Sequence, residues 1–297
     1  MKEVILSKDQ KAAVSTLKSL EEPTRASTGN ARADYTAMFT QPIKLFPYLF
    51  GLVFLLLWQF RGIHTLFSLE RYQLPIPSDI ITAMRENGDI LLIYSLYTGV
   101  EIIGGFLIGS LLGWLAAIAA SFRPQAGAGA ISIMASLNAV PIVALAPIMN
   151  NWLGDGVASR MGIVSVMTMA TMAVSTYKGL RSIEPSYLEL MSSYAASARQ
   201  LFLKLRLPKA LPLIFSALKI NMSTSIIGAI VGEFFIASRG LGYLLSDQIR
   251  LANMPLAWAC IVIAAILGIV LYTIIQLLEK RFIPWSISNR NENEYLT

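Results

Sequence analysis

Residues 90–120 read ILLIYSLYTGVEIIGGFLIGSLLGWLAAIAA, and this long apolar run decides which class of fold the chain can adopt. Glu101 is the only charged residue in it. A helix needs about 20 apolar residues to cross a hydrocarbon core of about 30 Å, and the run exceeds that length. A helix also satisfies its backbone polar groups within one segment, as a lipid-embedded chain must. The run therefore predicts a membrane-spanning helix.

Further apolar runs lie on both sides of this one. They cover residues 46–60, 131–149, 162–176, 211–235 and 256–278. Of the 297 residues, 55% are hydrophobic and 14% are charged, and the mean hydropathy is +0.59, which is outside the range of ordinary soluble domains. We therefore expect an all-α membrane protein, a polytopic bundle of about six transmembrane helices.

Basic residues are distributed unevenly between the two sides of this arrangement. If the amino terminus is cytoplasmic, most of them fall in the inner segments, and especially in a long loop at residues 177–211. The positive-inside rule then places this loop and both termini in the cytoplasm. We expect a polar cytoplasmic tail at residues 1–42, a transmembrane domain at residues 43–285, and a second cytoplasmic tail at residues 286–297. Because topology explains the positive charge, we expect no nucleic-acid partner.

Motifs that would indicate catalysis or nucleotide binding are missing from the sequence. It has no Gly-x-x-x-x-Gly-Lys-Ser/Thr phosphate loop, no nucleophile elbow, and no cluster of histidines and carboxylates with metal-ligand spacing. The single cysteine, Cys260, lies in the last apolar run, and the single histidine, His64, follows the first. We therefore expect no catalytic residue, no metal site and no cofactor.

The cytoplasmic loop contains an amphipathic segment, PSYLELMSSYAASARQLFLKLRLP at residues 185–208. Its apolar residues from Tyr187 to Ala198 recur at helical spacing, and Pro185 suits the first position of a helix. Ser197 and Gln200 form a capping-box pattern that would begin a second short helix. The segment predicts two helices joined by a tight turn on the cytoplasmic face. From composition alone, such helices could equally rest on lipid headgroups.

The spacing of this segment resembles the signature of ABC transporter permeases, the membrane subunits of ATP-driven importers. That signature reads Glu-Ala-Ala, three residues, Gly, nine residues, Ile, one residue, Leu-Pro. Here Glu189 takes the first place, Ala195 the glycine place and Leu205 the isoleucine place, without a gap. Leu190 and Met191 replace the two alanines of the signature. An alanine at the glycine place would resist a positive φ at the turn.

The resemblance implies that this loop forms a coupling helix that sits in a groove of a separate ATPase subunit. The residues to which it assigns this coupling role are Glu189, Leu190, Met191, Tyr194, Ala195, Ala196, Ser197, Leu205, Leu207 and Pro208.

Other stretches extend the resemblance over roughly residues 72–285. They are LPIPSDI at residues 74–80, SLNAVPIVALAPIMNNWLGDG at residues 136–156 and GEFFIASRGLGYL at residues 232–244. They are similar to the nitrate, sulfonate and taurine branch of the importers. The resemblance implies a type I ABC importer permease fold in the bacterial inner membrane. It also implies an ATPase subunit, an extracytoplasmic solute-binding protein and a second copy of the chain as partners, with membrane lipid around them.

Five residues within the spans are candidates for the translocation path. Prolines remove backbone donors and bend helices, and broken helices in membranes often line water-filled cavities. Intramembrane polar groups are costly unless they face the bundle interior or a cavity. The candidates are Glu101, Asn138, Pro141, Pro147 and Glu233. We expect Glu101 to have a partner, Glu233 to be relieved by water near the outer end of its span, and Lys219 to extend its ammonium to the cytoplasmic surface.

Two other functions compete with the importer permease. An ion-coupled secondary transporter would have an internal repeat and a buried ion-binding pair, and the sequence shows neither. An integral membrane enzyme would have reactive groups clustered near one interface, and none are apparent. The importer permease is therefore the preferred hypothesis, with a small solute such as a sulfonate, a nitrate-like anion or a vitamin precursor as cargo.

Overall fold

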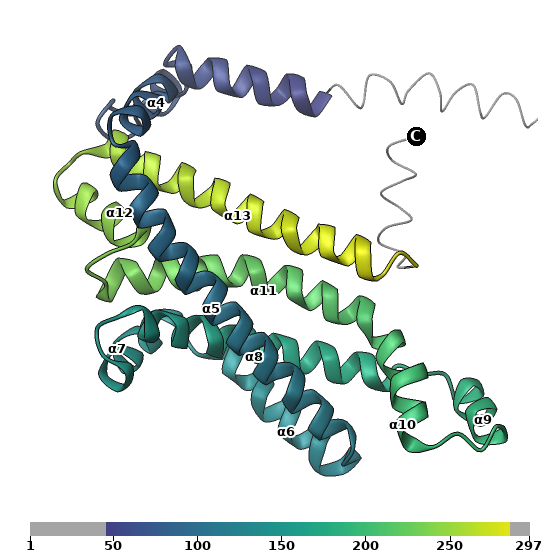
Figure 1. Ribbon diagram of the computed structural model, residues 1–297. Coiled ribbons are helices and arrows are strands. Elements are labelled where there is room, and N and C mark those ends of the chain that lie inside the picture. The colour runs from purple at the N-terminus through teal and green to yellow at the C-terminus, as the bar shows by residue number, and fades with distance from the viewer. Residues whose placement is uncertain (1–45, 286–297) are drawn as a thin grey trace, which may run out of the picture. The chain divides into compact units, whose positions relative to one another are not determined.

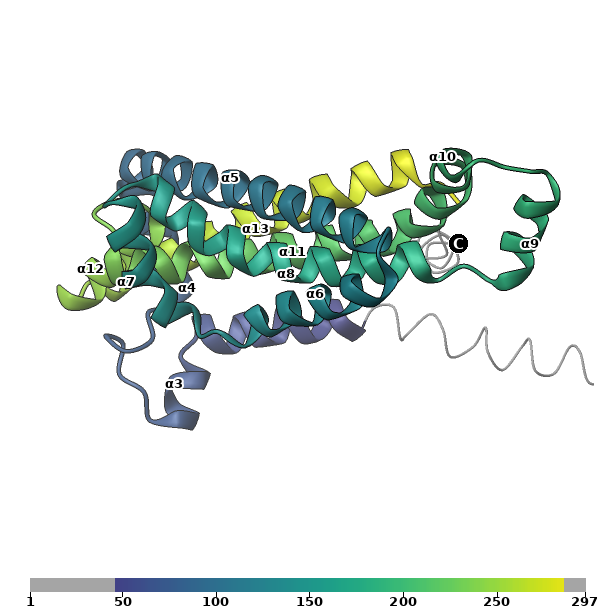
Figure 2. The same ribbon diagram turned by 90° about the horizontal axis from the view of Figure 1, so that it is seen from below.

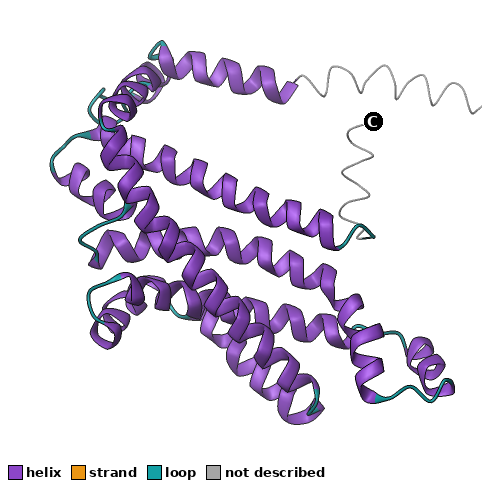
Figure 3. Ribbon diagram, in the orientation of Figure 1, coloured by secondary structure: helices purple, strands orange, loops and turns teal. Residues whose placement is uncertain are grey.

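A computed structural model describes residues 46–285 of the protein. The predicted tails at residues 1–42 and 286–297 lie outside the described residues. Within the described range the chain forms helices and turns, with no strand (Figure 3). The chain divides into two units, one ending at Ile63 and the other beginning at His64. The prediction of an all-α fold is confirmed.

The first unit contains an apolar helix, Phe46–Gln59, whose large side chains are mostly exposed. At a rise of 1.5 Å per residue it is too short to cross a hydrocarbon core of about 30 Å by itself. The predicted first span therefore corresponds to a real but short helix. Helix α3 (Gly62–Phe67) follows it and bridges the unit boundary.

Four long helices form the second unit, and each is long and apolar enough to cross a membrane. They are α5 (Gly88–Ser121), α8 (Val157–Arg181), the continuous helix Ala198–Ile236, and α13 (Met254–Phe282). The continuous helix consists of α10 (Ala198–Leu201), a π-helical turn η2 (Phe202–Arg206) and α11 (Leu207–Ile236). Figures 1 and 2 show α5, α8, α11 and α13 running along the length of this unit.

The predicted span at residues 131–149 is two helices rather than one. Helix α6 (Pro124–Ser136) ends in the short 3-10 helix η1 (Leu137–Ala139), and α7 (Ile142–Leu153) departs from the preceding helix at an angle of 101°. Pro141 precedes α7 in an extended conformation and has no N–H to continue the ladder. Pro147 lies inside α7. Within residues 46–285, length and composition thus support four spans, or five if the bent pair counts as one, rather than six.

Glycines on α5 allow α8 to approach closely. A Cβ on Gly105 would meet Val164, and one on Gly113 would meet the backbone of Met169. Small residues at helix interfaces in membranes permit such backbone contact, which favours van der Waals packing. These glycines of α5 therefore form a packing face within the subunit. Nearby, the core continues through Ile102, Phe106, Val164, Met222, Ala229, Leu271 and Ile275.

Short helices lie at the two ends of the second unit. Helices α4 (Pro77–Glu86), α7 and α12 (Leu241–Arg250) are at one end, and α9 (Pro185–Ser193) and α10 are at the other (Figures 1 and 2). The predicted coupling loop and the Gly-Leu-Gly stretch at residues 240–242 therefore lie at opposite ends of the long helices.

Candidate functional site

Helix α9 and the turn after it form the first candidate site. Glu184 is the N-cap residue and Pro185 takes the first helical position, as the sequence predicts. The turn is a Schellman motif, because Ala196 N donates to Met191 O at 3.0 Å and Ala195 N donates to Ser192 O at 2.8 Å. These two bonds satisfy carbonyls that the end of α9 would otherwise leave unpaired.

Ala195 has a positive φ of 48°, the left-handed conformation that a Schellman motif requires after the helix cap. Glycine adopts this conformation freely, whereas a residue with a Cβ is strained by about 1–2 kcal/mol. The left-handed backbone at this place explains why the signature has a glycine there. Ala195 occupies the place without changing the turn. The turn has the geometry of the motif despite the substitution.

The chain leaves the turn through the predicted capping box. Gln200 N donates to Ser197 Oγ at 3.3 Å, and Ser197 N donates to Gln200 Oε1 at 2.8 Å. The sequence predicts a second short helix here, but the helix continues through η2 into α11. Leu205 lies in η2, and Leu207 and Pro208 begin α11, so these three coupling candidates are on a different helix from Glu189.

Apolar side chains of α9 and its turn are left uncovered. Tyr194 is 76% exposed and Leu190 is 52% exposed, while Met191 and Ala196 are half-buried. Uncovered aromatic and aliphatic side chains that cluster outside the spans mark a surface for contact with protein or lipid. The geometry therefore provides a short, capped helix with an apolar face available to a partner.

A buried polar network forms the second candidate site, near the end of the unit where α12 lies. Arg160, in the first turn of α8, donates from Nε to Glu101 Oε1 on α5 at 3.2 Å. Both side chains are nearly inaccessible, at 4% and 2% exposure. Arg160 also donates from Nη1 to the more exposed Asp155 at 3.1 Å. The expectation that Glu101 has a partner is confirmed.

The Gly-Leu-Gly stretch closes over the carboxylate of Glu233. Gly242 N donates to Glu233 Oε2 at 2.7 Å, and Thr98 Oγ1 donates to Glu233 Oε1 at 2.6 Å. Leu241 N donates in turn to Thr98 Oγ1 at 2.9 Å. Glu233 is completely buried, so the expectation that water relieves it is wrong. Hydrogen bonds from α5 and the start of α12 take the place of water.

Substitution of Gly240 is expected to disrupt this closure. Gly240 has φ +106°, and a Cβ there would collide with the Glu233 carboxylate. We expect Gly240→Ala to lower the free energy of unfolding by more than about 2 kcal/mol, because backbone strain of about 1–3 kcal/mol adds to weakened buried hydrogen bonds. Thermal unfolding of the purified protein in detergent measures the loss. Gly99→Ala is the control, since a Cβ at Gly99 meets nothing within 4 Å, and an unchanged Gly240→Ala protein would contradict the closure.

A second buried ion pair joins α11 to α13 closer to the other end. Lys219 Nζ lies 2.8 Å from Glu279 Oε2, and the Glu279 side chain is 2% exposed. The expectation that Lys219 simply extends to the cytoplasmic surface is therefore wrong, because its ammonium pairs with a buried carboxylate. Sequence reasoning missed Glu279 and Arg160 as partners, although a carboxylate within an apolar run requires a cation. That requirement is the signal that could have found Arg160.

The remaining pathway candidates are on the surface of the chain. Asn138, Pro141 and Pro147 are exposed, whereas Glu101 and Glu233 are enclosed by their own subunit. Of the five candidates, only Asn138, Pro141 and Pro147 have atoms that a solute could contact in this conformation. Thr171 Oγ1 lies 3.5 Å from Asn138 Oδ1, so α8 adds a second polar side chain beside the break. The five candidates do not form one site.

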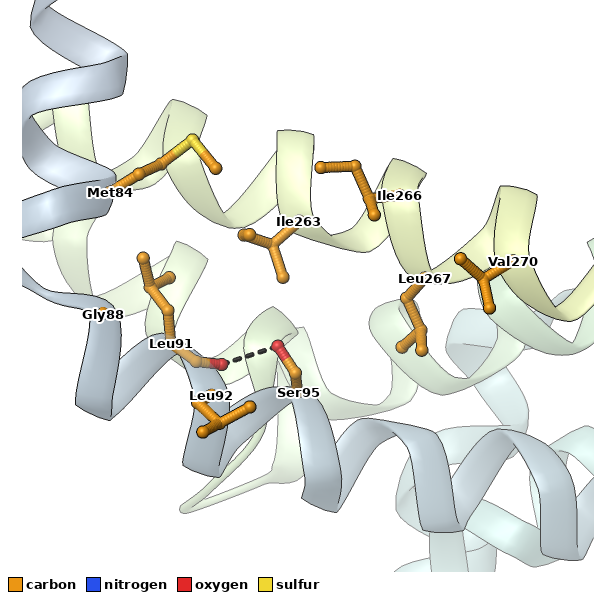
Figure 4. A pocket seen from close by; sticks show the side chains of 9 residues that line it. All are labelled: Met84, Gly88, Leu91, Leu92, Ser95, Ile263, Ile266, Leu267 and Val270. Atoms are coloured by element: carbon orange, nitrogen blue, oxygen red, sulfur yellow. Dashed lines mark hydrogen bonds between the residues drawn. The ribbon is translucent and has the colours of Figure 1, made fainter.

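An apolar groove of about 380 Å³ lies between the start of α5 and α13 (Figure 4). Leu92, Ile266 and Val270 are among the residues that line it, and the Ser95 hydroxyl on its wall donates to Leu91 O at 2.6 Å. Its polar group is already paired and none of its lining residues in the described part of the chain is charged, so the groove is a hydrophobic packing surface rather than a solute site. Residues 46–285 also contain no cluster of side chains that could hold a metal ion.

Comparison with known proteins assigns this architecture to a family. Residues 109–284 match the family described as binding-protein-dependent transport system inner membrane component. The chain is 34% identical to a probable ABC transporter permease protein of Haemophilus influenzae, over 79% of this chain and 95% of the relative. It is 30% identical to the formylaminopyrimidine transport permease ThiX of Halalkalibacterium halodurans, over 80% and 95% of the two chains.

Structural comparison gives the same fold. The chain aligns with the permease fold in inward-facing MetNI methionine ABC transporter crystals, with a TM-score of 0.53 and 17% identity, covering 66% of this chain and 95% of that one. A putative aliphatic sulfonates permease, SsuC of Bacillus subtilis, is 25% identical over 78% of this chain and 84% of its own. The chain therefore belongs to the binding-protein-dependent inner membrane components, as an ABC importer permease of the nitrate, sulfonate and taurine type.

Proposed function

We propose that two copies of this permease form a path for a small solute, and that a separate ATPase drives transport by binding α9 and the turn after it. The observation that carries the proposal is the α9 turn, in which a Schellman motif and a capping box hold an exposed apolar helix in one conformation. A partner that binds a preorganised helix loses less conformational entropy on association. The coupling residues on α9 and its turn, from Glu189 to Ser197, are the proposed contact.

The break between α6 and α7 supports the proposed path. Asn138 is exposed beside Pro141, within the apolar part of the chain. Polar side chains at membrane depth normally face a bundle interior or a water-filled cavity rather than lipid. A second copy placed against this face would enclose such a cavity, with Asn138, Thr171 and the Pro141 break on its wall. Glu101 and Glu233 do not line this path; their buried bonds hold together the helices of each subunit that surround it.

The proposed solute is a sulfonate, a nitrate-like anion or a vitamin precursor. Relatives of this chain include permeases named for formylaminopyrimidine, aliphatic sulfonates and riboflavin. The proposed assembly also contains an extracytoplasmic binding protein that delivers the solute. Identification of the ligand held by that protein would decide among these solutes.

Cysteine labelling tests both the orientation of α9 and its contact with the ATPase. The background is Cys260→Ala, which removes a buried thiol. In this background we expect Ser192→Cys, an exposed position on α9, to react with an impermeant maleimide only from the cytoplasmic side. Co-expression of the cognate ATPase subunit should slow that reaction at least about tenfold, because docking covers the helix.

Ser238→Cys is the matched control at the opposite end of the unit. Ser238 is exposed between α11 and α12, so it should react from outside and at the same rate with or without the ATPase. Labelling of Ser192→Cys from outside would reject the proposed orientation. Cytoplasmic labelling that the ATPase leaves unchanged would reject α9 as its docking site.

A further inference from the structure

We propose that the α9 end of the subunit carries a binding site for an anionic phospholipid headgroup, formed by two adjacent grooves. The grooves have volumes of about 180 Å³ and 260 Å³ and share Ile183, which lies in the short connection between α8 and α9. Among residues 46–285, no Asp or Glu lines either groove, whereas two cationic side chains line each. This arrangement is suited to a phosphate group.

The first groove places two guanidinium groups at the ends of the long helices. Arg181 is the last residue of α8 and Arg206 the last residue of η2. Arg206 Nε is buried and has no hydrogen-bond partner within residues 46–285. A buried donor without a partner is costly, and an oxygen of a bound phosphate would remove that cost. Arg181 is oriented by a hydrogen bond from Nη1 to Tyr177 OH at 2.7 Å.

The π-helical turn η2 places one cationic side chain on each of the two grooves. Over Phe202–Arg206 the helix takes π-helical form, which is rare and often occurs at functional sites. Lys204 lines the second groove and Arg206 the first, so the same turn contributes to both. Lys209, in the first turns of α11, completes the cationic pair of the second groove. The turn thus spreads positive charge across the shared wall.

The second groove also has the apolar side that a lipid needs. Trp285, Tyr187 and Leu205 line it beside the two lysines. Tryptophan and tyrosine favour the membrane interface, where their rings contact both headgroups and acyl chains. Basic pockets between helices on the cytoplasmic side of a membrane protein bind the headgroups of anionic lipids. A soluble anion would use the cations but gain nothing from this aromatic wall.

Lipid retention in nanodiscs tests the proposal with the full-length chain. The permease is reconstituted with phosphatidylcholine containing a minor fraction of phosphatidylglycerol, and tightly bound lipid is quantified by native mass spectrometry. Wild-type protein should retain phosphatidylglycerol in preference to phosphatidylcholine. Arg206→Gln and Lys209→Gln should each lower that retention about fivefold, the effect expected for one basic residue at an anionic membrane surface. Equal retention in wild-type and variant proteins would overturn the proposal.

Arg199→Gln is the matched control, because Arg199 is an exposed cation on α10 that lines neither groove. It should retain phosphatidylglycerol like the wild type, and loss of retention in it would show unspecific charge attraction and reject the site. Thermal unfolding in pure phosphatidylcholine provides a check on folding, and no variant should unfold at a lower temperature than the wild type.

Two further arms distinguish other occupants of the grooves. If millimolar inorganic phosphate raises the unfolding temperature in pure phosphatidylcholine as much as phosphatidylglycerol does, and Arg206→Gln abolishes both effects, the site binds free phosphate and the lipid assignment is wrong. If Arg206→Gln loses the ATPase in co-purification while it retains phosphatidylglycerol normally, the grooves hold acidic side chains of that subunit, and the lipid assignment is likewise wrong.

Discussion

Replacement of Ala196 by Asp is expected to stop transport without removing the permease from the membrane. Ala196 follows the left-handed residue of the Schellman motif and is half-buried in the free chain. An ATPase docked on the turn would cover it completely, and a carboxylate there would lose its water without gaining a partner. A disrupted anchor in such an interface costs more than about 2 kcal/mol, which is about thirtyfold in affinity.

Two measurements in the same cells check this result: co-purification of the ATPase with the permease, and uptake of the solute. Ala195→Gly is the control, since glycine adopts the φ of 48° without strain and keeps the turn. It should retain both ATPase and uptake. If α9 instead rests on lipid headgroups, Ala196→Asp would change only surface affinity. Full uptake with a normal amount of bound ATPase would therefore reject the coupling role.

Removal of the Arg160 side chain is expected to have the largest effect on stability. Arg160→Met leaves Glu101 buried at 1% exposure without its cation. Breaking a buried ion pair from one side costs about 3–5 kcal/mol, because the remaining charge is uncompensated. We expect a lower unfolding temperature in detergent and a smaller amount of protein in the membrane fraction. The double variant Glu101→Gln, Arg160→Met should recover much of this loss.

Arg71→Met provides the matched control for the loss of an arginine. Arg71 pairs with Asp79 at 2.8 Å on the surface, and its side chain is 57% exposed. Hydrogen bonding and charge attraction from Asp79 raise the pKa of the Arg71 guanidinium, but water and salt screen such exposed pairs. The unfolding temperature of Arg71→Met should therefore stay close to that of the wild type. If the double variant is no more stable than Arg160→Met, the pair does not carry the stability of this site.

Local sequence signals predicted the local structure of the coupling segment. Pro185 begins α9, and the reciprocal bonds of Ser197 and Gln200 begin the next helix, because both signals act over one helical turn. Pro141 predicted a break in its span for the same reason. The angle of 101° was not predictable, because packing against neighbouring helices sets it, whereas the start of α6 at Pro124 has the same local signal as Pro185.

Contacts between distant residues account for what the sequence left open. Glu101 and Arg160 lie in different spans, as do Lys219 and Glu279, and no local pattern connects them. The apolar surroundings of Glu101 and Glu233 in the sequence indicated that their carboxylates need polar partners. Only the packed bundle shows which groups those partners are. The Gly-Leu-Gly stretch is similar: its presence suggested a family, whereas its contact with Glu233 explains why glycine is required at Gly240.

The continuous helix Ala198–Ile236 has a mechanical consequence. Its 39 residues, at about 1.5 Å each, give a length along the helix of roughly 58 Å from the capping box to the turn that contains Glu233. The π-helical turn η2 and Pro212 lie near the capping-box end, and both a π turn and a proline are places where a helix bends (Figure 1). A pull on Ser197 would therefore first change this bend, and the remainder of α11 would carry the movement as a stiff segment to Glu233 and the start of α12.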